Sequence, residues 1–352
     1  MPDFHKILTL WYQQNKRDLP WRVNNEPYSV WISEIILQQT RIDQGTAYYL
    51  RFIDRFPDIE SLADSSEEEV LKMWQGLGYY SRARNMHHAA KQIMTEFNGK
   101  FPDSYNNIRS LKGIGDYTAA AIASISFGLD NAVIDGNVYR ALSRIFGIAT
   151  PIDTTEGKKE FSVLAHSLLD KQNPGIFNEA LMEFGALQCV PRNPLCNQCP
   201  FQNRCVAFNN KQVELLPVKS KQPKQKNRYF NYLYILHEGN FYLEKRQAKD
   251  IWHNLYQFPL IETIEQFNET EIISSKEFQN LFNGLKVSIN SVTPEIIHQL
   301  THQKLHIRFF QITLSQQIIN SPWIMTNERE VSRFPIPKPI DNYLINKLFE
   351  PY

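Results

Sequence analysis

The chain has 352 residues, of which 42% are hydrophobic and 21% charged, and its formal net charge is +1. This length is more than one ordinary hydrophobic core organises, so we expect two domains, and the composition is typical of a soluble globular protein. The near-neutral charge excludes a uniformly basic protein, although a segregated charge would still allow binding to a polyanion.

The N-terminal stretch is expected to hold no targeting or membrane segment. Residues 1–22, MPDFHKILTLWYQQNKRDLPWR, have polar and charged residues early, unlike a secretory signal, and no window of the chain approaches the roughly 18 apolar residues of a membrane span. We therefore expect a cytoplasmic protein without membrane contact. Its thiols would stay reduced there, which disfavours disulfide bonds.

Residues 1–208 are predicted to form an α-helical domain. No run of alternating strands occurs in this part of the sequence. Apolar periodicity with glycine and proline breakers predicts helices over Tyr28–Thr40, Thr46–Phe56, Glu67–Gln75, Ala83–Phe97, Thr118–Phe127 and Val138–Phe146.

The segment YSVWISEIILQQT, residues 28–40, has apolar residues on nearly every side of its predicted helix. Such a helix is buried, and Glu34 lies in its middle. Burial disfavours the ionised carboxylate, so the pKa of Glu34 should rise towards neutrality, which suits a general acid. An ion pair with an arginine is the alternative for this residue.

The glycines of SLKGIGDYTAAAIASISFG, residues 110–128, predict a tight turn between two helices. Gly113 and Gly115 allow the backbone to approach a ligand, and a helix opened by Thr118 presents free N–H groups to an anion. The pattern is typical of a helix–hairpin–helix that binds DNA phosphate, although a plain helix–helix turn uses the same glycines.

A second carboxylate, Asp135, follows the apolar residues 132–134 and precedes a helix that begins near Asn137. We expect the N–H groups and dipole of that helix to hold Asp135 ionised. One carboxyl group with a raised pKa and one with a low pKa would suit glycosidic bond hydrolysis, because one protonates the leaving group and the other stabilises an oxocarbenium ion. A simple N-cap is the structural alternative.

All four cysteines lie in CVPRNPLCNQCPFQNRC, residues 189–205. The spacing alone leaves zinc and an iron–sulfur cluster equally open. Arg192 and Arg204 lie in the same loops, where they would meet either DNA phosphate or solvent. The candidate ligands are Cys189, Cys196, Cys199 and Cys205.

The composition changes after the cysteines. Residues 209–228, NNKQVELLPVKSKQPKQKNR, hold six Lys or Arg residues and one acidic residue, which predicts a basic linker. This linker is either a solvated tether or a strap that contacts phosphate. Residues 229–352 are predicted to form a separate α+β domain, because runs such as YFNYLYIL and KLHIRFFQITL are strand-like and turns are expected at 238–240 and 283–284.

Six motifs occur in one order along nearly the whole chain: LPWR (19–22), SEIILQQT (33–40), GLGYYSRA (76–83), LKGIGDYTA (111–119), VIDGNVYR (133–140) and the four cysteines. Together they resemble the endonuclease III superfamily of helix–hairpin–helix DNA glycosylases. Within it, the chain is similar to the branch that removes adenine mispaired with 8-oxoguanine, or guanine, from double-stranded DNA in base excision repair.

The resemblance implies roles for the matching residues. Glu34 would protonate adenine, and Asp135 would stabilise the sugar cation. Asn137 and Tyr117 would orient and support this chemistry. The other matches would lie near the extruded base or fill the space that it leaves: Arg22 and Glu183 near the adenine, and Gln39, Thr40 and Tyr79 in the base stack.

The resemblance also implies a subclass and a cofactor. Bifunctional relatives carry a lysine at the position of Tyr117, whose amine attacks the sugar, whereas a phenol cannot form a Schiff base. A monofunctional glycosylase is therefore implied, acting as a monomer that associates with the bacterial nucleoid through DNA. The four cysteines would bind a [4Fe–4S] cluster with a structural and DNA-docking role.

The segment LEKRQAKDIWHNLYQFPLIE, residues 243–262, resembles the Nudix-like domain that these glycosylases use to recognise 8-oxoguanine. The recognition loop of that domain matches Leu300, Thr301 and His302, with Leu and Thr in place of the family's Phe and Ser. Thr301 keeps a hydroxyl, but Leu300 cannot stack as an aromatic ring would. The glutamate-rich magnesium box of hydrolytic Nudix enzymes is missing from the sequence, and a related fold need not hydrolyse anything.

Three other functions make different demands on the sequence. A bifunctional glycosylase/lyase for oxidised pyrimidines would need an amine at position 117. A non-catalytic DNA-binding relative would be expected to have lost Glu34 or Asp135, and both are present. A Nudix pyrophosphohydrolase would need the missing acidic box.

Overall fold

A computed structural model describes residues 3–220, 225–283, 285–318 and 321–349. The chain divides into two compact units, one formed by residues 1–65 and 85–222 and the other by residues 66–84 and 223–352. Residues 221–224 of the predicted linker and residue 284 of the predicted turn lie outside the described residues.

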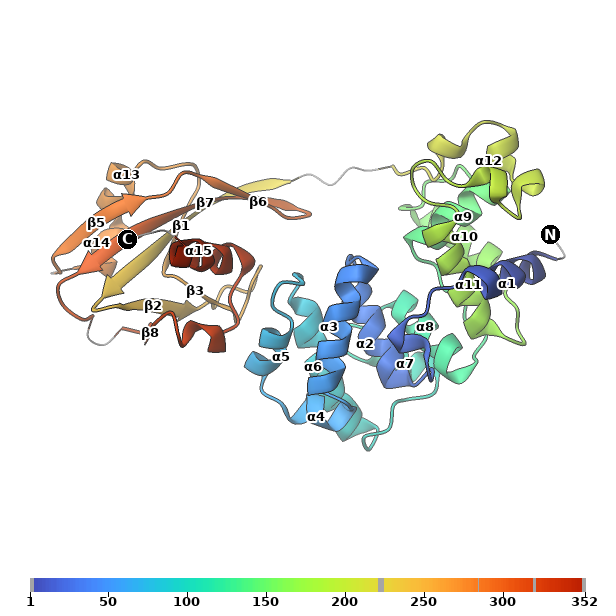
Figure 1. Ribbon diagram of the computed structural model, residues 1–352, viewed down its shortest axis with the longest axis horizontal. Coiled ribbons are helices and arrows are strands. Elements are labelled where there is room, and N and C mark those ends of the chain that lie inside the picture. Colours follow the sequence, from blue (N-terminus) through green and yellow to red (C-terminus); the bar gives the residue numbers. More distant parts are fainter. Residues whose placement is uncertain (1–2, 221–224, 284, 319–320, 350–352) are drawn as a thin grey trace. The chain divides into compact units, whose positions relative to one another are not determined.

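The first unit is built from helices (Figure 1), so the helical prediction for this part of the chain is confirmed. Short 3-10 turns, η1 to η4, join several of them. The elements are α1 (Phe4–Asn15), η1 (Pro20–Arg22), α2 (Pro27–Leu37), α3 (Ile42–Arg55), α4 (Ile59–Asp64), most of α6 (Ser81–Glu96), α7 (Tyr105–Ser110), α8 (Asp116–Phe127), α9 (Gly136–Phe146), α10 (Thr155–Leu168), α11 (Pro174–Leu187), η2 (Cys196–Gln198), η3 (Gln202–Arg204), α12 (Val206–Asn209) and η4 (Val213–Leu215).

Helix α2 is buried on nearly all sides, as its sequence predicted, but it ends three residues earlier than expected. Pro27 begins it, at a position where proline is well tolerated. The helix stops at Leu37, and Gln39 adopts a left-handed backbone with φ of 59°. The prediction that the helix runs to Thr40 is therefore wrong, and residues 38–40 form a turn instead.

An apolar cluster of the first unit joins the N-terminal helix to the cysteine loop, residues 189–205. Helices α1, α9, α10 and α11 share this apolar cluster. Phe201, which lies between Cys199 and Cys205, is fully buried there. Its ring stacks on Phe4 with 4.8 Å between centroids and meets Phe184 edge-on at 5.4 Å. The cysteine loop is thus anchored to the helical core by aromatic packing.

The second unit is a mixed sheet with helices (Figure 1), and its α+β prediction is confirmed. The strand order is β3-β2-β1-β7-β5, with β4 paired to β1, β6 to β7 and β8 to β2. Among the strands that the structure describes, only β1 and β7 pair in parallel. The elements are α5 (Glu67–Met73), β1 (Lys226–His237), β2 (Asn240–Lys245), β3 (Tyr256–Gln257), β4 (Leu260–Thr263), α13 (Glu269–Ser274), α14 (Lys276–Leu281), β5 (Val287–Val292), β6 (Ile296–Gln299), β7 (Gln303–Leu314), β8 (Ile324–Thr326), the 3-10 turn η5 (Val331–Arg333) and α15 (Lys338–Phe349).

Strand β1 is buried on both faces because helices cover the sheet on each side. Its alternate residues Leu233 and Ile235 pack in the apolar cluster that includes α13 and α14. Tyr234 points the other way, towards Tyr343 of α15, with 5.4 Å between ring centroids. A turn at Glu238 and Gly239, both with positive φ, joins β1 to β2, as the sequence predicted.

Residues 66–84 belong to the second unit through polar contacts with the sheet. Glu68 of α5 accepts hydrogen bonds from Lys245 Nζ and from the Tyr256 hydroxyl, both at 2.6 Å. Arg84 donates to the carbonyl of His253 at 2.8 Å. The GLGYYS turn of residues 76–81 contacts the loop between β6 and β7 through a hydrogen bond between Tyr79 and Thr301.

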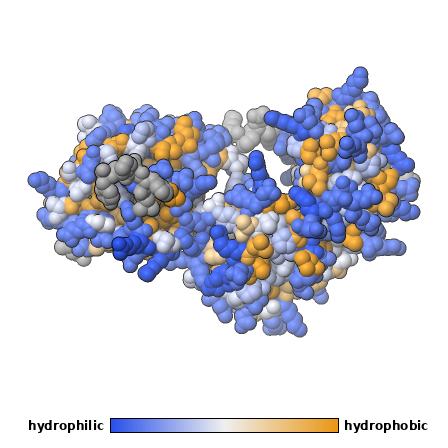
Figure 2. Space-filling view, in the orientation of Figure 1, coloured by the Kyte–Doolittle hydropathy of each residue, from blue (hydrophilic) through white to orange (hydrophobic). Residues whose placement is uncertain are grey.

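The surface is mostly hydrophilic on the face shown in Figure 2, with hydrophobic residues in small separate groups. This distribution is expected where apolar side chains are used for the two cores. Among the described residues, no helix has both the length and the apolar character needed to cross a membrane.

Candidate active site

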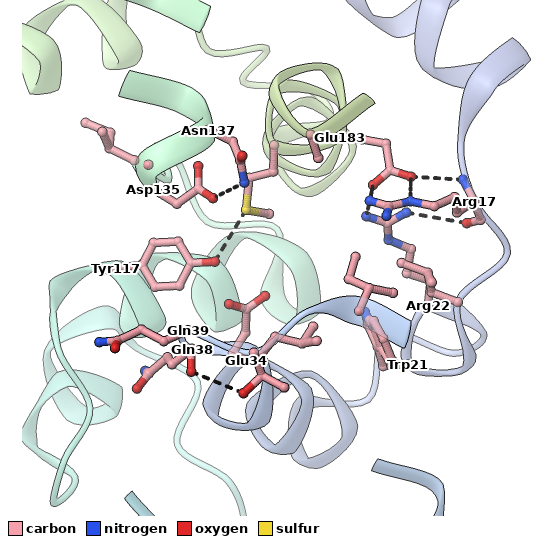
Figure 3. Close-up of a pocket in the computed structure, with 18 residues that line it drawn as sticks. Arg17, Trp21, Arg22, Glu34, Gln38, Gln39, Tyr117, Asp135, Asn137 and Glu183 are labelled. Atoms are coloured by element: carbon pink, nitrogen blue, oxygen red, sulfur yellow. Dashed lines mark hydrogen bonds and ion pairs between the residues drawn. The ribbon is translucent and has the colours of Figure 1, made fainter. Parts of the chain in front are cut away.

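A cavity of about 490 Å³ in the first unit brings eight of the predicted residues together (Figure 3). Its walls come from η1, α2, the turn after α2, α8, the start of α9 and α11. The predicted residues in its lining are Arg22, Glu34, Gln39, Thr40, Tyr117, Asp135, Asn137 and Glu183.

Glu34 projects from α2 into this cavity towards Tyr117 and Asp135 (Figure 3). Burial raises its pKa to about 7, and the charge of Asp135 adds to the rise, while the Tyr117 hydroxyl and Arg22 partly offset it. The predicted rise towards neutrality is confirmed. Arg22 makes its ion pairs with Glu179 and Glu183 instead, at 3.2 and 3.1 Å.

Asp135 is the N-cap of α9, as the sequence predicted. Its Oδ1 accepts from the main-chain N–H of Val138 at 2.8 Å, and its Oδ2 accepts from Asn137 Nδ2 at 2.6 Å. Burial nevertheless raises the pKa of Asp135, although these hydrogen bonds oppose the rise. The prediction that the helix holds this pKa down is therefore wrong, because burial outweighs the N–H groups.

Tyr117 also lines the cavity, near Asp135 and Glu34 (Figure 3). Its hydroxyl contacts Met182 Sδ at 3.4 Å. Burial and the charge of Glu34 raise its pKa well above the ordinary value, so the phenol stays protonated. Tyr117 can therefore donate a hydrogen bond to a carboxylate, but it cannot act as an amine nucleophile.

Asn137 is linked to the cysteine loop through Arg140, which sequence reasoning missed. Arg140 Nη2 donates to Asn137 Oδ1 at 2.9 Å and to the carbonyl of Gly185 at 2.5 Å, and Nε donates to the carbonyl of Cys189 at 2.7 Å. The spacing of three residues between Asn137 and Arg140 on one helix is the only local signal for this contact.

Gly185 lets α11 lie directly against the turn that carries Asn137. A methyl group at position 185 would lie 2.6 Å from the Asn137 carbonyl oxygen and 2.7 Å from its Cβ. Neither of these atoms can move without shifting the start of α9. The glycine therefore fixes the spacing of the two cavity walls formed by α11 and α9.

Glu183 is almost fully buried in a cluster with two arginines on the opposite side of the cavity (Figure 3). Arg17 binds both of its carboxylate oxygens, each at 2.8 Å, and Arg22 Nη2 lies 3.1 Å from Oε2. Burial opposes ionisation, but Arg17 and Arg22 together lower the pKa of Glu183 to about 2. Arg17 was missed from sequence, although it lies two residues before the LPWR motif.

The helix–hairpin–helix turn differs in detail from the prediction. Gly113 needs its φ of +80°, and a side chain there would meet Asn85 at 2.5 Å. Gly115 is the N-cap of α8, and an added Cβ would meet nothing within 4 Å. The helix begins at Asp116, and Thr118 is buried, where it accepts from Gln38 Nε2 at 3.4 Å. The prediction that Thr118 opens the helix is therefore wrong, because the helix begins two residues earlier.

The four cysteines line one apolar pocket beside a buried arginine, Arg144. Arg144 Nη1 lies 3.6 Å from Cys189 Sγ, and main-chain N–H groups point at the sulfurs of Cys199 and Cys205. Burial raises the pKa of Cys199 to about 12, so ionising it depends on positive charge entering the pocket. Four thiols with inward N–H donors suit a thiolate-bound inorganic group.

No three His, Cys, Asp or Glu side chains in the described part of the chain are close enough to enclose a single metal ion. Arg192 and Arg204 are exposed on the cysteine loops.

The remaining predicted residues lie in the second unit, around a cavity of about 510 Å³. Tyr79 has a left-handed backbone with φ of 48°, and its hydroxyl is hydrogen-bonded to the hydroxyl of Thr301. Thr301 and His302 are both exposed. Trp252, which also lines this cavity, was missed by the sequence reasoning.

Comparison with known proteins gave consistent matches. Residues 32–166 match the family described as HhH-GPD superfamily base excision DNA repair protein, and residues 231–346 match the NUDIX domain. The adenine DNA glycosylase of Buchnera aphidicola subsp. Acyrthosiphon pisum is 35% identical over 350 residues, which cover 97% of each chain.

Two further matches cover about three fifths of the chain. The human adenine DNA glycosylase is 41% identical over 222 residues, covering 60% of this chain and 41% of the human protein. A solved structure of a thermostable thymine-DNA glycosylase superimposes with a TM-score of 0.55 and 28% identity, covering 59% of this chain and 96% of that one.

Proposed function

Because the chain belongs to the family of adenine DNA glycosylases, which makes it a DNA glycosylase, we propose that it hydrolyses the N-glycosidic bond of adenine mispaired with 8-oxoguanine, or guanine, in double-stranded DNA. The observation that carries this proposal is the pair Glu34 and Asp135. They share one cavity, and the pKa of Glu34 is raised to about 7, which is the value a general acid needs at neutral pH.

The chemistry begins when the adenine nucleotide leaves the base stack and the base enters the cavity. Protonated Glu34 donates its proton to a ring nitrogen of adenine, and the bond between the sugar and the base then breaks heterolytically. The positive charge left on the sugar faces ionised Asp135, which stabilises it electrostatically or through a transient ester. Glu34, now ionised, accepts a proton from the water that attacks the sugar.

Neighbouring side chains position these two carboxylates. Asn137 donates to Asp135 Oδ2 and is itself held by Arg140. Arg22 and the ion-paired Glu183 form the wall against which the base would bind. Gln39 and Thr40, in the turn after α2, would enter the space left in the base stack, a role that we also assign to Tyr79.

We assign the enzyme to the monofunctional class. A lyase reaction needs an amine that forms a Schiff base with the sugar, and position 117 holds a tyrosine. The protonated phenol supports Glu34 and leaves the DNA backbone intact.

The Nudix-like domain is proposed to recognise 8-oxoguanine through Thr301 and His302. Both residues are exposed at the rim of the second cavity, and the Thr301 hydroxyl is paired with that of Tyr79. A hydroxyl can both donate to and accept from the lesion. Leu300 would support the loop by apolar contact alone, since it has no aromatic face.

The four cysteines are proposed to bind a [4Fe–4S] cluster. The cluster would cross-link η2, η3 and the end of α11 and supply no electron to a hydrolysis. Arg144 and the inward N–H groups would stabilise its thiolates. We further propose that the enzyme acts as a monomer in the cytoplasm, with Gly113, Gly115, Arg192 and Arg204 at the DNA backbone.

The test uses a duplex with one 8-oxoguanine:adenine pair, incubated with the protein and then heated in alkali. We expect an alkali-labile site at the adenine and none at adenine paired with thymine. Absence of that site would refute the proposed substrate. Strand cleavage without alkali would refute the monofunctional assignment.

A further inference from the structure

The side chain of Arg22 is held by a second glutamate, Glu179, that lies behind the base cavity. Arg22 Nε is 3.2 Å from Glu179 Oε1, and the two side chains are 15% and 13% exposed. The Tyr12 hydroxyl donates to Glu179 Oε2 at 3.1 Å, and the Arg22 guanidinium lies 5.7 Å from the centre of the Tyr12 ring. Arg22 is thus enclosed by Glu179, Glu183 and an aromatic face.

Glu179 holds the Nε edge of the Arg22 guanidinium, whereas Glu183 holds Nη2 at 3.1 Å. Both oxygens of Glu183 already receive hydrogen bonds from Arg17. Glu179 instead pairs with the Nε edge of the Arg22 guanidinium, which fixes the rotation of that planar group. Tyr12 in turn fixes the carboxylate of Glu179.

Glu179 and Tyr12 do not line the cavity that contains Glu34. A neighbouring cavity of about 770 Å³ lies in the same unit. Among the described residues, Arg17, Leu19 and Arg22 line both cavities, whereas Glu179 and Tyr12 line only this neighbouring one. Any influence of Glu179 on the reaction must therefore pass through Arg22 or through its charge.

We infer that Glu179, oriented by Tyr12, is a positioning residue that aims the Arg22 guanidinium at the base cavity and balances its positive charge beside Glu34. This inference deepens the proposed function and rests on it. It assigns a role to a carboxylate that is four residues, or about one helical turn, before Glu183 on α11.

The charge balance is visible in the groups whose charges or hydrogen bonds act on Glu34. They are Tyr117 from α8, Asp135 at the start of α9, Arg22 from η1 and Glu179 from α11. The charges of Asp135 and Glu179 raise the pKa of Glu34, whereas Tyr117 and Arg22 lower it. Removing the negative charge of Glu179 leaves more of the positive charge of Arg22 uncompensated. Glu34 should therefore lose its proton at a lower pH.

The experiment measures adenine release in single turnovers from an 8-oxoguanine:adenine duplex between pH 5.5 and 9. Glu179→Gln keeps the shape but removes the charge. We expect its rate to fall on the alkaline side at a pH lower by roughly 0.5 unit than in the parent. Glu179→Asp keeps the charge but withdraws the carboxylate, so the rate should fall about threefold to tenfold with the alkaline limb unmoved.

Two controls separate this role from a structural one. Glu160→Gln removes an exposed glutamate on α10 and should match the parent at every pH. Tyr12→Phe removes only the hydrogen bond to Glu179, and it carries the test if Glu179→Gln does not fold. We expect Tyr12→Phe to shift the alkaline limb in the same direction by a smaller amount.

The outcomes are distinct. A uniform loss of rate or thermal stability in Glu179→Gln, with the parent's pH profile unchanged, would show a purely structural residue and overturn the inference. A profile identical to the parent in both rate and pH would overturn it as well. If the parent itself releases no adenine, the proposed function fails and not the role of Glu179.

Discussion

The guanidinium of Arg140 donates a hydrogen bond to the side-chain oxygen of Asn137 at 2.9 Å. The same guanidinium holds the carbonyl of Cys189, the first cysteine of the loop, at 2.7 Å. The amide that supports Asp135 is therefore oriented from the cysteine loop. The geometry of the proposed catalytic residues and the integrity of that loop are therefore joined through one side chain.

Arg140→Gln should reduce adenine release much more than DNA affinity. Losing a charged hydrogen bond costs about 1.5–3 kcal/mol, so we expect a fall in the single-turnover rate of roughly tenfold to a hundredfold. Binding to an uncleavable duplex should stay within about threefold of the parent. Arg55→Gln, an exposed arginine of α3, is the matched control. An equal loss of rate and affinity would contradict a positioning role for Arg140.

Glu34→Gln should remove most of the catalytic activity and stabilise the fold at alkaline pH. The folded pKa of about 7 lies above the ordinary value of 4.5, so the stability linked to the bound proton is present at low pH and lost as pH rises through 7. At pH 8 the free energy of unfolding of the variant should exceed that of the parent by about 1–2 kcal/mol, and near pH 4.5 the two should be equal. Single-turnover rates should fall by about 10²–10⁴-fold. Melting curves at the two pH values provide the check.

The rate of adenine release should show a bell-shaped dependence on pH. Glu34 must be protonated, so the rate falls above pH 7. Asp135 must be ionised, and burial raises its pKa, so the acid limb lies above that of an ordinary aspartate. Asn137→Ala removes a hydrogen bond that favours ionised Asp135, and should move the acid limb to higher pH. A rate that keeps rising above pH 8 would exclude Glu34 as the acid.

Cys199→Ser should remove the proposed cluster. We expect the parent to contain iron and acid-labile sulfide in equal amounts and to absorb visible light, and the variant to lose both properties. Because the cluster would cross-link the loop, the variant should also melt at lower temperature. Zinc in place of iron would contradict the assignment, and metal analysis of the purified chain distinguishes the two.

Thr301→Val should weaken the preference for 8-oxoguanine over guanine opposite adenine. Loss of one hydrogen bond of about 1 kcal/mol predicts a fall in that preference of roughly fivefold to tenfold. The rate with guanine opposite adenine should change little. Thr313→Val, at an exposed position on β7, is the control. An unchanged preference would remove Thr301 from lesion recognition.

The two carboxylates could be found from sequence because their settings are local. Glu34 lies within an apolar helix, and Asp135 lies directly before one. The pKa of Asp135 was mispredicted because its burial comes from elements elsewhere in the chain, such as α2 and α11. A helix N-terminus identifies hydrogen-bond donors but says nothing of what covers them.

Residues whose partners are distant in sequence could not be found in this way. Arg17 pairs with Glu183 across 166 positions, and Arg140 reaches Cys189 across 49. The short strands β3, β4, β6 and β8 were missed for a related reason, since two to four residues form a strand only when a neighbour pairs with them. The end of helix α2 was mispredicted because the left-handed backbone of Gln39, which follows the helix, has no reliable signature in sequence.

Gly185 makes the width of the base cavity a property of main chain rather than of side chains. The helix that carries Glu183 rests on the backbone of the Asn137 turn with no room for a methyl group between them. Enlarging the cavity for a bulkier base by trimming its lining would therefore leave this spacing unchanged, whereas Gly185→Ala would separate the first turn of α9, next to Asp135, from the helix that carries Glu183. Base size and catalytic alignment are set by the same contact, so neither can be altered independently at this position.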